Sequence, residues 1–229
     1  MIVVVLALSA IVGAVGIGGR SADATVTPDV QLVARYLATL VQPDGSVLDP
    51  WAYPPAPSIT ATVDVALALA EAGTEPAALG RTLAYIEPNT PTYVTEVGTN
   101  TTGRYAYLIM LAVATGRNPR SYGPTHVDLV AGLDGRFGME EPGLYGPINA
   151  YASVMIHSLA ILAEHAAGAT VPASALTWLE SQQCGPGNNS EGGWQPYRAP
   201  SGGALAACDV SSSSTYAGAD ANSTAFAIQ

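Results

Sequence analysis

A repeated order of segments constrains this sequence most: an amphipathic helix, then a turn rich in Gly or polar residues, then an apolar or aromatic residue that closes the turn. In the first copy, VQLVARYLATLVQPDGSV, apolar residues recur at the spacing of one helix face before the turn at 43–45. These residues are Val30, Val33, Leu37, Leu40 and Val41. The same order returns in HVDLVAGLDGRFG and in ALTWLESQQCGPGNNSEGGW, which indicates a helical repeat.

Helices of a second kind lie between these copies and are apolar on nearly all sides. VDVALALAEAG, AYLIMLAVATG and YASVMIHSLAILAEHAAG each end in Gly, which suits the left-handed stop of a helix. A fourth begins in DANSTAFAIQ, where Asp220 or Asn222 can be the N-cap. We expect these helices inside and the amphipathic ones outside. The Pro-rich segments DPWAYPPAPS and EPNTPTY are expected to be ordered, kinked loops.

The Gly residues that end the apolar helices give the repeat a period. Gly73 and Gly116 are about 43 residues apart, and Gly168 follows about 52 residues later. One helical hairpin cannot bury its apolar face alone, so neighbours must stack, either as an open solenoid or as a closed ring. The sequence predicts an all-α repeat domain over 25–229 with about three and a half hairpins, incomplete at its C-terminal end.

Composition and charge exclude some partners. Of the 229 residues, 48% are hydrophobic and 11% are charged, so the chain can bury a large core. The formal net charge of -10 disfavours nucleic acid and anionic membranes as partners. All eight basic residues are Arg, which is typical of a GC-rich bacterial source.

Residues 1–24, MIVVVLALSAIVGAVGIGGRSADA, have the pattern of an export signal. An apolar run of about 17 residues is followed by Ala22-Asp23-Ala24, a small-x-small cleavage pattern. No basic segment precedes the run, so an uncleaved N-terminal anchor is the alternative. We expect a secreted or cell-surface protein that touches a membrane only through that segment, if it is retained.

The chain has two cysteines, Cys184 and Cys208, on either side of one Gly-rich segment. An exported chain meets an oxidising environment, so we expect a disulfide between them. A reactive thiol is the disfavoured alternative, because Cys184 follows the end of a helix, where the helix dipole opposes a thiolate.

WLESQQ followed by GGWQ, and less closely YLATLVQPDGSV, resemble the Gln-Trp repeat of squalene cyclases, where an aromatic-Leu-x-x-Gln segment leads to a Gly-x-Trp turn. DANSTAFAIQ is similar to the helix start that follows this turn. The resemblance is to the terpenoid cyclase and protein prenyltransferase superfamily. It implies an α/α toroid of concentric inner and outer helices, here a partial one. The repeat pattern covers about 200 residues, and the last unit matches best.

The chain departs from the catalytic motifs of that superfamily. No two Asp residues are adjacent, so the Asp-x-Asp-Asp acid is absent. Gln182 and Ala206 stand where an Asp-x-Cys zinc pair would need Asp. The run 184–187, Cys-Gly-Pro-Gly, lacks the Gln of a thioester motif. We therefore expect no cofactor, no metal site and no catalytic residue in this sequence.

Candidate ligand-binding residues come from the expected inner helices and from the turns: Trp51, Tyr53, Asp64, Tyr107, His157, Trp194, Tyr197 and Asp220. Aromatic side chains at a concave end suit an apolar or carbohydrate-like ligand. A structural role is the alternative for three of them. Trp194 would close its turn, His157 would be a hydrogen-bonded core residue, and Asp64 would be a charge favoured near a helix N-terminus.

These observations favour a secreted toroid module that binds an apolar or carbohydrate-like ligand, or a cell-surface partner, without catalysis. The alternative is a terpenoid cyclase or prenyl transferase that acts on an isoprenoid, with catalytic residues outside this sequence. A corrinoid carrier is a variant of the binding hypothesis, because secreted cobalamin-transport proteins also use an α/α barrel. No residue here identifies a corrinoid contact.

Overall fold

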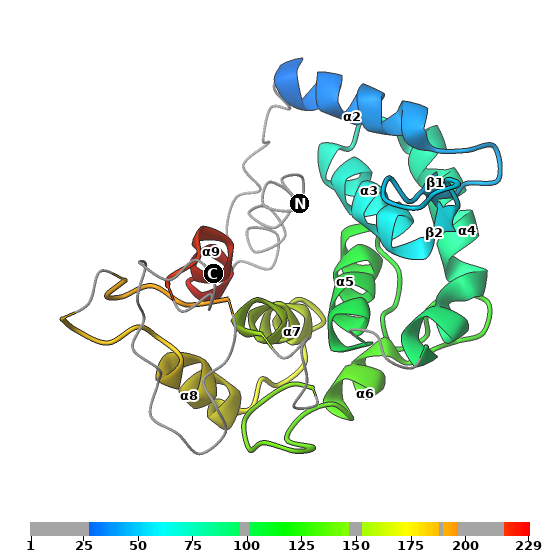
Figure 1. Ribbon diagram of the computed structural model, residues 1–229. Helices are drawn as coiled ribbons and strands as arrows, with labels where there is room; N and C mark the ends of the chain where they lie inside the picture. Colours follow the sequence, from blue (N-terminus) through cyan, green and yellow to red (C-terminus); the bar gives the residue numbers. More distant parts are fainter. Residues whose placement is uncertain (1–27, 97–100, 147–152, 188–189, 197–217) are drawn as a thin grey trace, which may run out of the picture. The chain divides into compact units, whose positions relative to one another are not determined.

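The computed structural model describes residues 28–96, 101–146, 153–187, 190–196 and 218–229. Within these ranges the chain is mainly helical and carries one small two-stranded antiparallel sheet (Figure 1). The elements are α2 (Pro28–Leu40), β1 (Val47–Leu48), β2 (Pro57–Ser58), α3 (Ile59–Ala72), α4 (Pro76–Thr95), α5 (Thr101–Ala114), α6 (Leu129–Asp134), α7 (Val154–Ala166), α8 (Ala173–Ser181) and α9 (Ala221–Ala227). The predicted helical character is confirmed.

The chain divides into two compact units. The first, 1–96 with 107–129, contains α2, the sheet, α3, α4 and most of α5. The second, 97–106 with 130–229, contains the first turns of α5, nearly all of α6, and α7 to α9. The predicted signal segment 1–24, Tyr197 and Cys208 lie outside the described residues.

In the first unit, α3 packs against both α2 and α4. Helix α3 begins at its N-cap Ser58 and ends at Gly73, whose φ of 63° gives the left-handed stop that the sequence predicts. The predicted buried face of α2 is partly wrong. Leu37 and Val41 are buried, whereas Val30 and Val33 are exposed.

The expectation that EPNTPTY forms a kinked loop is wrong, because this segment lies inside helix α4. Pro88 and Pro91 remove two main-chain donors from the helix. Side chains beside them donate to main-chain carbonyl oxygens one turn back: Asn89 to Tyr85 at 2.8 Å and Thr90 to Ile86 at 3.0 Å. Neither bond replaces a missing one, because the carbonyls that lose their main-chain donor to Pro88 and Pro91 are those of Ala84 and Glu87.

In the second unit, α7 packs against α8 and α9. Buried Val154, Leu179 and Trp194 form one apolar cluster there. Helix α7 is buried along most of its length, as its apolar sequence predicts.

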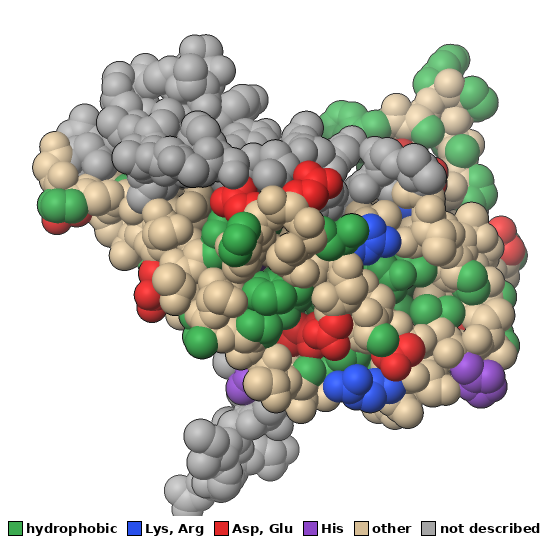
Figure 2. Space-filling view, turned by 90° about the horizontal axis from the view of Figure 1, so that it is seen from below, with side chains coloured by type: hydrophobic (Ala, Val, Ile, Leu, Met, Phe, Trp, Pro, Cys, Tyr) green, Lys and Arg blue, Asp and Glu red, His purple; other side chains and the backbone are tan. Residues whose placement is uncertain are grey.

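The surface shows the excess of acidic over basic residues that the sequence contains. On the face shown in Figure 2, acidic side chains lie among hydrophobic ones and basic side chains are few. In the part of the chain that the structure describes, no helix is long and apolar enough to span a membrane.

Candidate functional site

Three loops share one backbone pattern. An isolated antiparallel bridge closes each loop, and the pairs are Val41 with Val47, Phe137 with Tyr145, and Gln183 with Trp194. Inside each bridge a main-chain N–H donates to a carbonyl oxygen at 2.8 Å: Gln42 to Ser46, Gly138 to Leu144, and Cys184 to Gly193. We call Val47, Tyr145 and Trp194 the closing residues. The repeat that the sequence indicates is thus present as a repeated hydrogen-bond pattern.

The helix after each loop also begins in the same way. Its N-cap side chain accepts the N–H of the residue three positions on, and the N-caps are Ser58, Ser153 and Asp220. Four positions after the N-cap, a polar side chain accepts the N–H of the closing residue. These anchor residues are Thr62, His157 and Thr224, with hydrogen bonds of 2.9, 3.2 and 3.0 Å. Loop and helix are therefore tied together three times by equivalent bonds.

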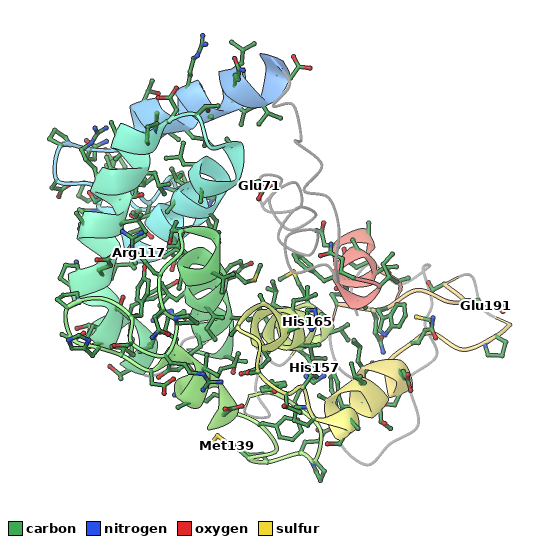
Figure 3. All side chains as sticks on the ribbon, turned by 180° about the vertical axis from the view of Figure 1, so that it is seen from behind. Glu71, Arg117, Met139, His157, His165 and Glu191 are labelled. Carbon is green, nitrogen blue, oxygen red and sulfur yellow. The ribbon has the colours of Figure 1, made fainter. Side chains whose placement is uncertain are left out.

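His157 is one of these anchors and is completely buried. Its Nδ1 accepts the N–H of Tyr145, so its Nε2 carries the proton and donates to the carbonyl oxygen of Ala175 at 3.0 Å. Burial lowers the pKa of His157 to about 4, which keeps the ring neutral. Figure 3 shows this side chain in the interior of the second unit. Both ring nitrogens of His157 therefore form hydrogen bonds to the main chain of the protein.

Trp194 and Asp220 are also used by the fold. The Trp194 indole Nε1 donates to the carbonyl oxygen of Leu179 at 2.8 Å, and the side chain is buried. The carboxylate of Asp220 accepts the N–H and the hydroxyl of Ser223 at 2.8 and 2.9 Å. Cys184 is buried in the same loop, and its predicted disulfide stays a prediction because Cys208 lies outside the described residues.

Trp51 and Tyr53 lie in the loop between β1 and β2, and their exposed fractions are 92% and 99%. The loop has internal hydrogen bonds: Asp49 accepts the N–H of Trp51 at 2.8 Å and donates its own N–H to the carbonyl oxygen of Ala56 at 2.8 Å. Two aromatic side chains, two residues apart in the sequence, are thus presented to solvent on a structured loop.

Asp64 breaks the repeat. It stands six positions after the N-cap Ser58, and the equivalent positions after the other two N-caps hold Leu159 and Phe226, both buried. Asp64 is half-buried, and burial raises the pKa of its carboxyl to about 6. Among the described residues, an ion pair joins Arg117 to Glu87, and Asp64 takes part in none. A carboxyl therefore occupies a position that the scaffold elsewhere fills with an apolar side chain.

Tyr107 of α5 lies near Asp64. Burial, and then the charge of Asp64, raise the pKa of the Tyr107 phenol above its ordinary value, and Tyr93 of α4 contributes to the same shift. The Tyr93 hydroxyl is 3.3 Å from the Oγ1 of Thr60, which stands four residues before Asp64 on the same face of α3. We call Thr60, Asp64, Tyr93 and Tyr107 the polar cluster. The structure brings together Asp64 and Tyr107, both of which the sequence singles out, and adds two residues that sequence reasoning missed.

A second carboxyl extends this face of α3. Glu71 stands seven residues after Asp64, two turns further along the helix, and its position in the last turn is labelled in Figure 3. Burial raises the pKa of Glu71. Among the described residues, no group of three His, Cys, Asp or Glu side chains could hold a metal ion.

Comparisons with protein-family models, with curated proteins and with solved structures each found no match. Membership of the terpenoid cyclase and prenyltransferase superfamily therefore stays a prediction from the sequence.

Proposed function

We propose that this chain is a ligand-binding module whose site is the polar cluster on α3, α4 and α5. Its ligand is an apolar molecule that carries hydroxyl groups, as a carbohydrate-like amphiphile does. One observation carries the proposal: Asp64 occupies the position at which the equivalent helices bury Leu159 and Phe226.

A half-buried carboxyl is costly to the fold. Burial disfavours the charged form, as the raised pKa of Asp64 indicates, so an apolar residue would stabilise α3 better. Residues that cost stability in this way are found where a site needs them. Donors on a bound ligand would offset the cost by hydrogen bonding to the carboxylate, while the apolar surroundings take the rest of the ligand.

The exposed aromatic pair adds a contact surface. The loop that carries Trp51 and Tyr53 leads through β2 directly into α3, the helix that bears Asp64. Exposed Trp and Tyr side chains on an ordered loop suit stacking against a sugar ring or an apolar partner surface.

The architecture we propose for this module is a partial α/α toroid, exported to the cell surface. The three equivalent loops support a stack of helical hairpins, and the sequence of 1–24 supports export.

A second candidate function is proton transfer to an isoprenoid by Asp64. A carboxyl whose pKa is about 6 is partly protonated near neutral pH and can act as an acid. It differs from the cyclase alternative drawn from the sequence, which places the catalytic residues outside this sequence, because here Asp64 would be the proton donor.

The test is calorimetric titration at neutral pH with octyl glucoside and with farnesol as probes, each below its critical micelle concentration. We expect octyl glucoside to bind, and Asp64→Asn and Trp51→Ala each to weaken binding at least about tenfold. Asp134→Asn, an exposed aspartate in α6, is the matched control and should bind as wild type does. Equal binding by Asp64→Asn and wild type, or no binding of either probe, contradicts the proposal. Conversion of farnesol to a new product by wild type and not by Asp64→Asn would favour the enzyme.

A further inference from the structure

Helices α5 and α7 end with the same main-chain hydrogen bonds. Each is followed by a left-handed glycine, Gly116 or Gly168, and both glycines have a φ of 67°. The glycine N–H donates to the carbonyl oxygen three residues back, at 3.1 Å after α5 and at 3.0 Å after α7. The N–H of the next residue donates to the carbonyl oxygen five residues back, at 2.7 and 2.9 Å. These shared bonds align α5 with α7 residue by residue.

The alignment makes Tyr107 the equivalent of Asp64. Tyr107 stands nine residues before Gly116, and the completely buried Leu159 stands nine residues before Gly168. Leu159 is also the equivalent of Asp64, because both stand six positions after a side-chain N-cap. One position of the repeat, which is apolar in α7, therefore holds a carboxyl in α3 and a phenol in α5.

The side chains of Asp64 and Tyr107 are close but not bonded to each other. Burial, and then the charge of Asp64, raise the pKa of Tyr107, so the carboxyl lies within electrostatic reach of the phenol. Neither side chain has a hydrogen bond to any residue that the structure describes. In contrast, the hydroxyl of Tyr93 in the same cluster lies 3.3 Å from the Oγ1 of Thr60. Two complementary polar groups thus remain for a ligand.

Their hydrogen-bonding capacities select the chemical group that can join them. At pH 7.5 the Asp64 carboxyl, with a pKa of about 6, is mostly ionised and can only accept. The Tyr107 phenol has a raised pKa, so it keeps its proton and can donate. A group that bridges the two must donate to the carboxylate and accept from the phenol. A hydroxyl does both, whereas an ammonium group only donates and an ether or carbonyl oxygen only accepts.

We propose that one hydroxyl of the ligand bridges Asp64 and Tyr107, which makes Tyr107 a specificity-determining residue and the ligand an alcohol rather than an amine or an ether. The inference rests on the proposed ligand site and narrows the ligand class. The bound hydroxyl would supply the polar link between α3 and α5 that no described side chain makes at this position.

The test is a double-mutant cycle, measured by calorimetric titration of the full chain with octyl glucoside at pH 7.5. Asp64→Asn and Tyr107→Phe should each weaken binding about tenfold, because each removes or weakens one bond to the hydroxyl. The double variant should lose about 10- to 30-fold rather than about 100-fold, because two bonds that share one hydroxyl strengthen each other. Tyr36→Phe changes an exposed tyrosine of α2 and should bind as wild type does.

Tyr107→Phe removes a hydroxyl that has no hydrogen bond to a described residue, so its urea midpoint should equal that of wild type. An equal midpoint separates a lost ligand contact from a damaged fold. If Tyr107→Phe binds as tightly as wild type, or if the two losses multiply to about 100-fold, the bridge is wrong, while weaker binding by Asp64→Asn would still support the proposed site. Absence of octyl glucoside binding by wild type would overturn this inference together with the ligand class on which it rests.

Discussion

The main-chain N–H of Tyr145 donates a hydrogen bond of 3.2 Å to the Nδ1 of His157, and this bond ties a loop to the second turn of α7. Thr62 and Thr224 accept the equivalent bonds from Val47 and Trp194. His157, a candidate ligand-binding residue in the sequence, is therefore part of the repeated hydrogen-bond pattern that ties loops to helices.

His157 should make the protein less stable in mild acid. Burial lowers its pKa to about 4 from 6.5, so between these values the unfolded chain binds a proton that the native chain does not. Its contribution to the free energy of unfolding is complete above pH 6.5 and falls by up to about 3 kcal/mol as the pH approaches 4.

Urea unfolding of wild type and of His157→Gln at several pH values measures this pH-dependent loss of stability. The loss between neutral pH and pH 4 should be smaller in the variant, and His165→Gln, at an exposed position of α7, should keep the wild-type profile. Identical profiles for wild type and His157→Gln would contradict this role.

Thr62 should be a stabilising anchor. Its Oγ1 accepts the Val47 N–H at 2.9 Å and donates to the carbonyl oxygen of Ser58 at 2.6 Å, and the residue is buried. Thr62→Val keeps the shape but leaves the N–H unsatisfied, which should cost about 1 to 3 kcal/mol in chemical denaturation. Thr39→Val, at an exposed position of α2, is the control and should change little. If both substitutions lower the free energy of unfolding by the same amount, the hydrogen bond from Val47 to Thr62 does not stabilise the fold as proposed.

The sequence predicted the helices where local signals are strong. The Gly stop of α3 follows from apolar periodicity and from the need for a left-handed residue at Gly73. The C-terminal half of α4 could not be predicted, because Pro88 and Pro91 are local helix breakers and the helix nevertheless continues through both of them.

The candidate site was predictable only in part. Asp64 and Tyr107 stand out as polar residues on apolar helices, but a sequence cannot tell whether Asp64 merely favours the helix dipole. To decide between these roles, the three helices must be aligned at their N-caps. The sequence does not give this alignment, because the loops differ in length: residues 42–46, 138–144 and 184–193 lie between the bridge residues. Only the shared hydrogen bonds show that Leu159 and Phe226 are the equivalents of Asp64.

The predicted disulfide between Cys184 and Cys208 should contribute on the order of 3 kcal/mol to stability through the loop that it closes. Alkylation of the denatured, unreduced protein followed by mass spectrometry should add no group, and prior reduction should add two. Reduction should also lower the midpoint of urea unfolding. Alkylation of both cysteines without reduction would contradict the pairing.

The central claim is that Asp64 is kept for a ligand and not for the fold. The stability of the variant Asp64→Leu tests this claim most directly. The substitution gives α3 the residue that stands at the equivalent position of α7. The native pKa is raised to about 6 from 3.8, so burial of the carboxylate lowers stability as the pH rises through this range. In urea unfolding at pH 7.5 the account predicts a gain of about 1 to 2 kcal/mol over wild type, shrinking toward pH 4, where the native carboxyl is protonated. Asp134→Leu, at an exposed position of α6, controls for the general effect of removing an aspartate. An Asp64→Leu protein that is less stable than wild type at pH 7.5 would show that Asp64 serves the fold, and the proposed site would lose its support.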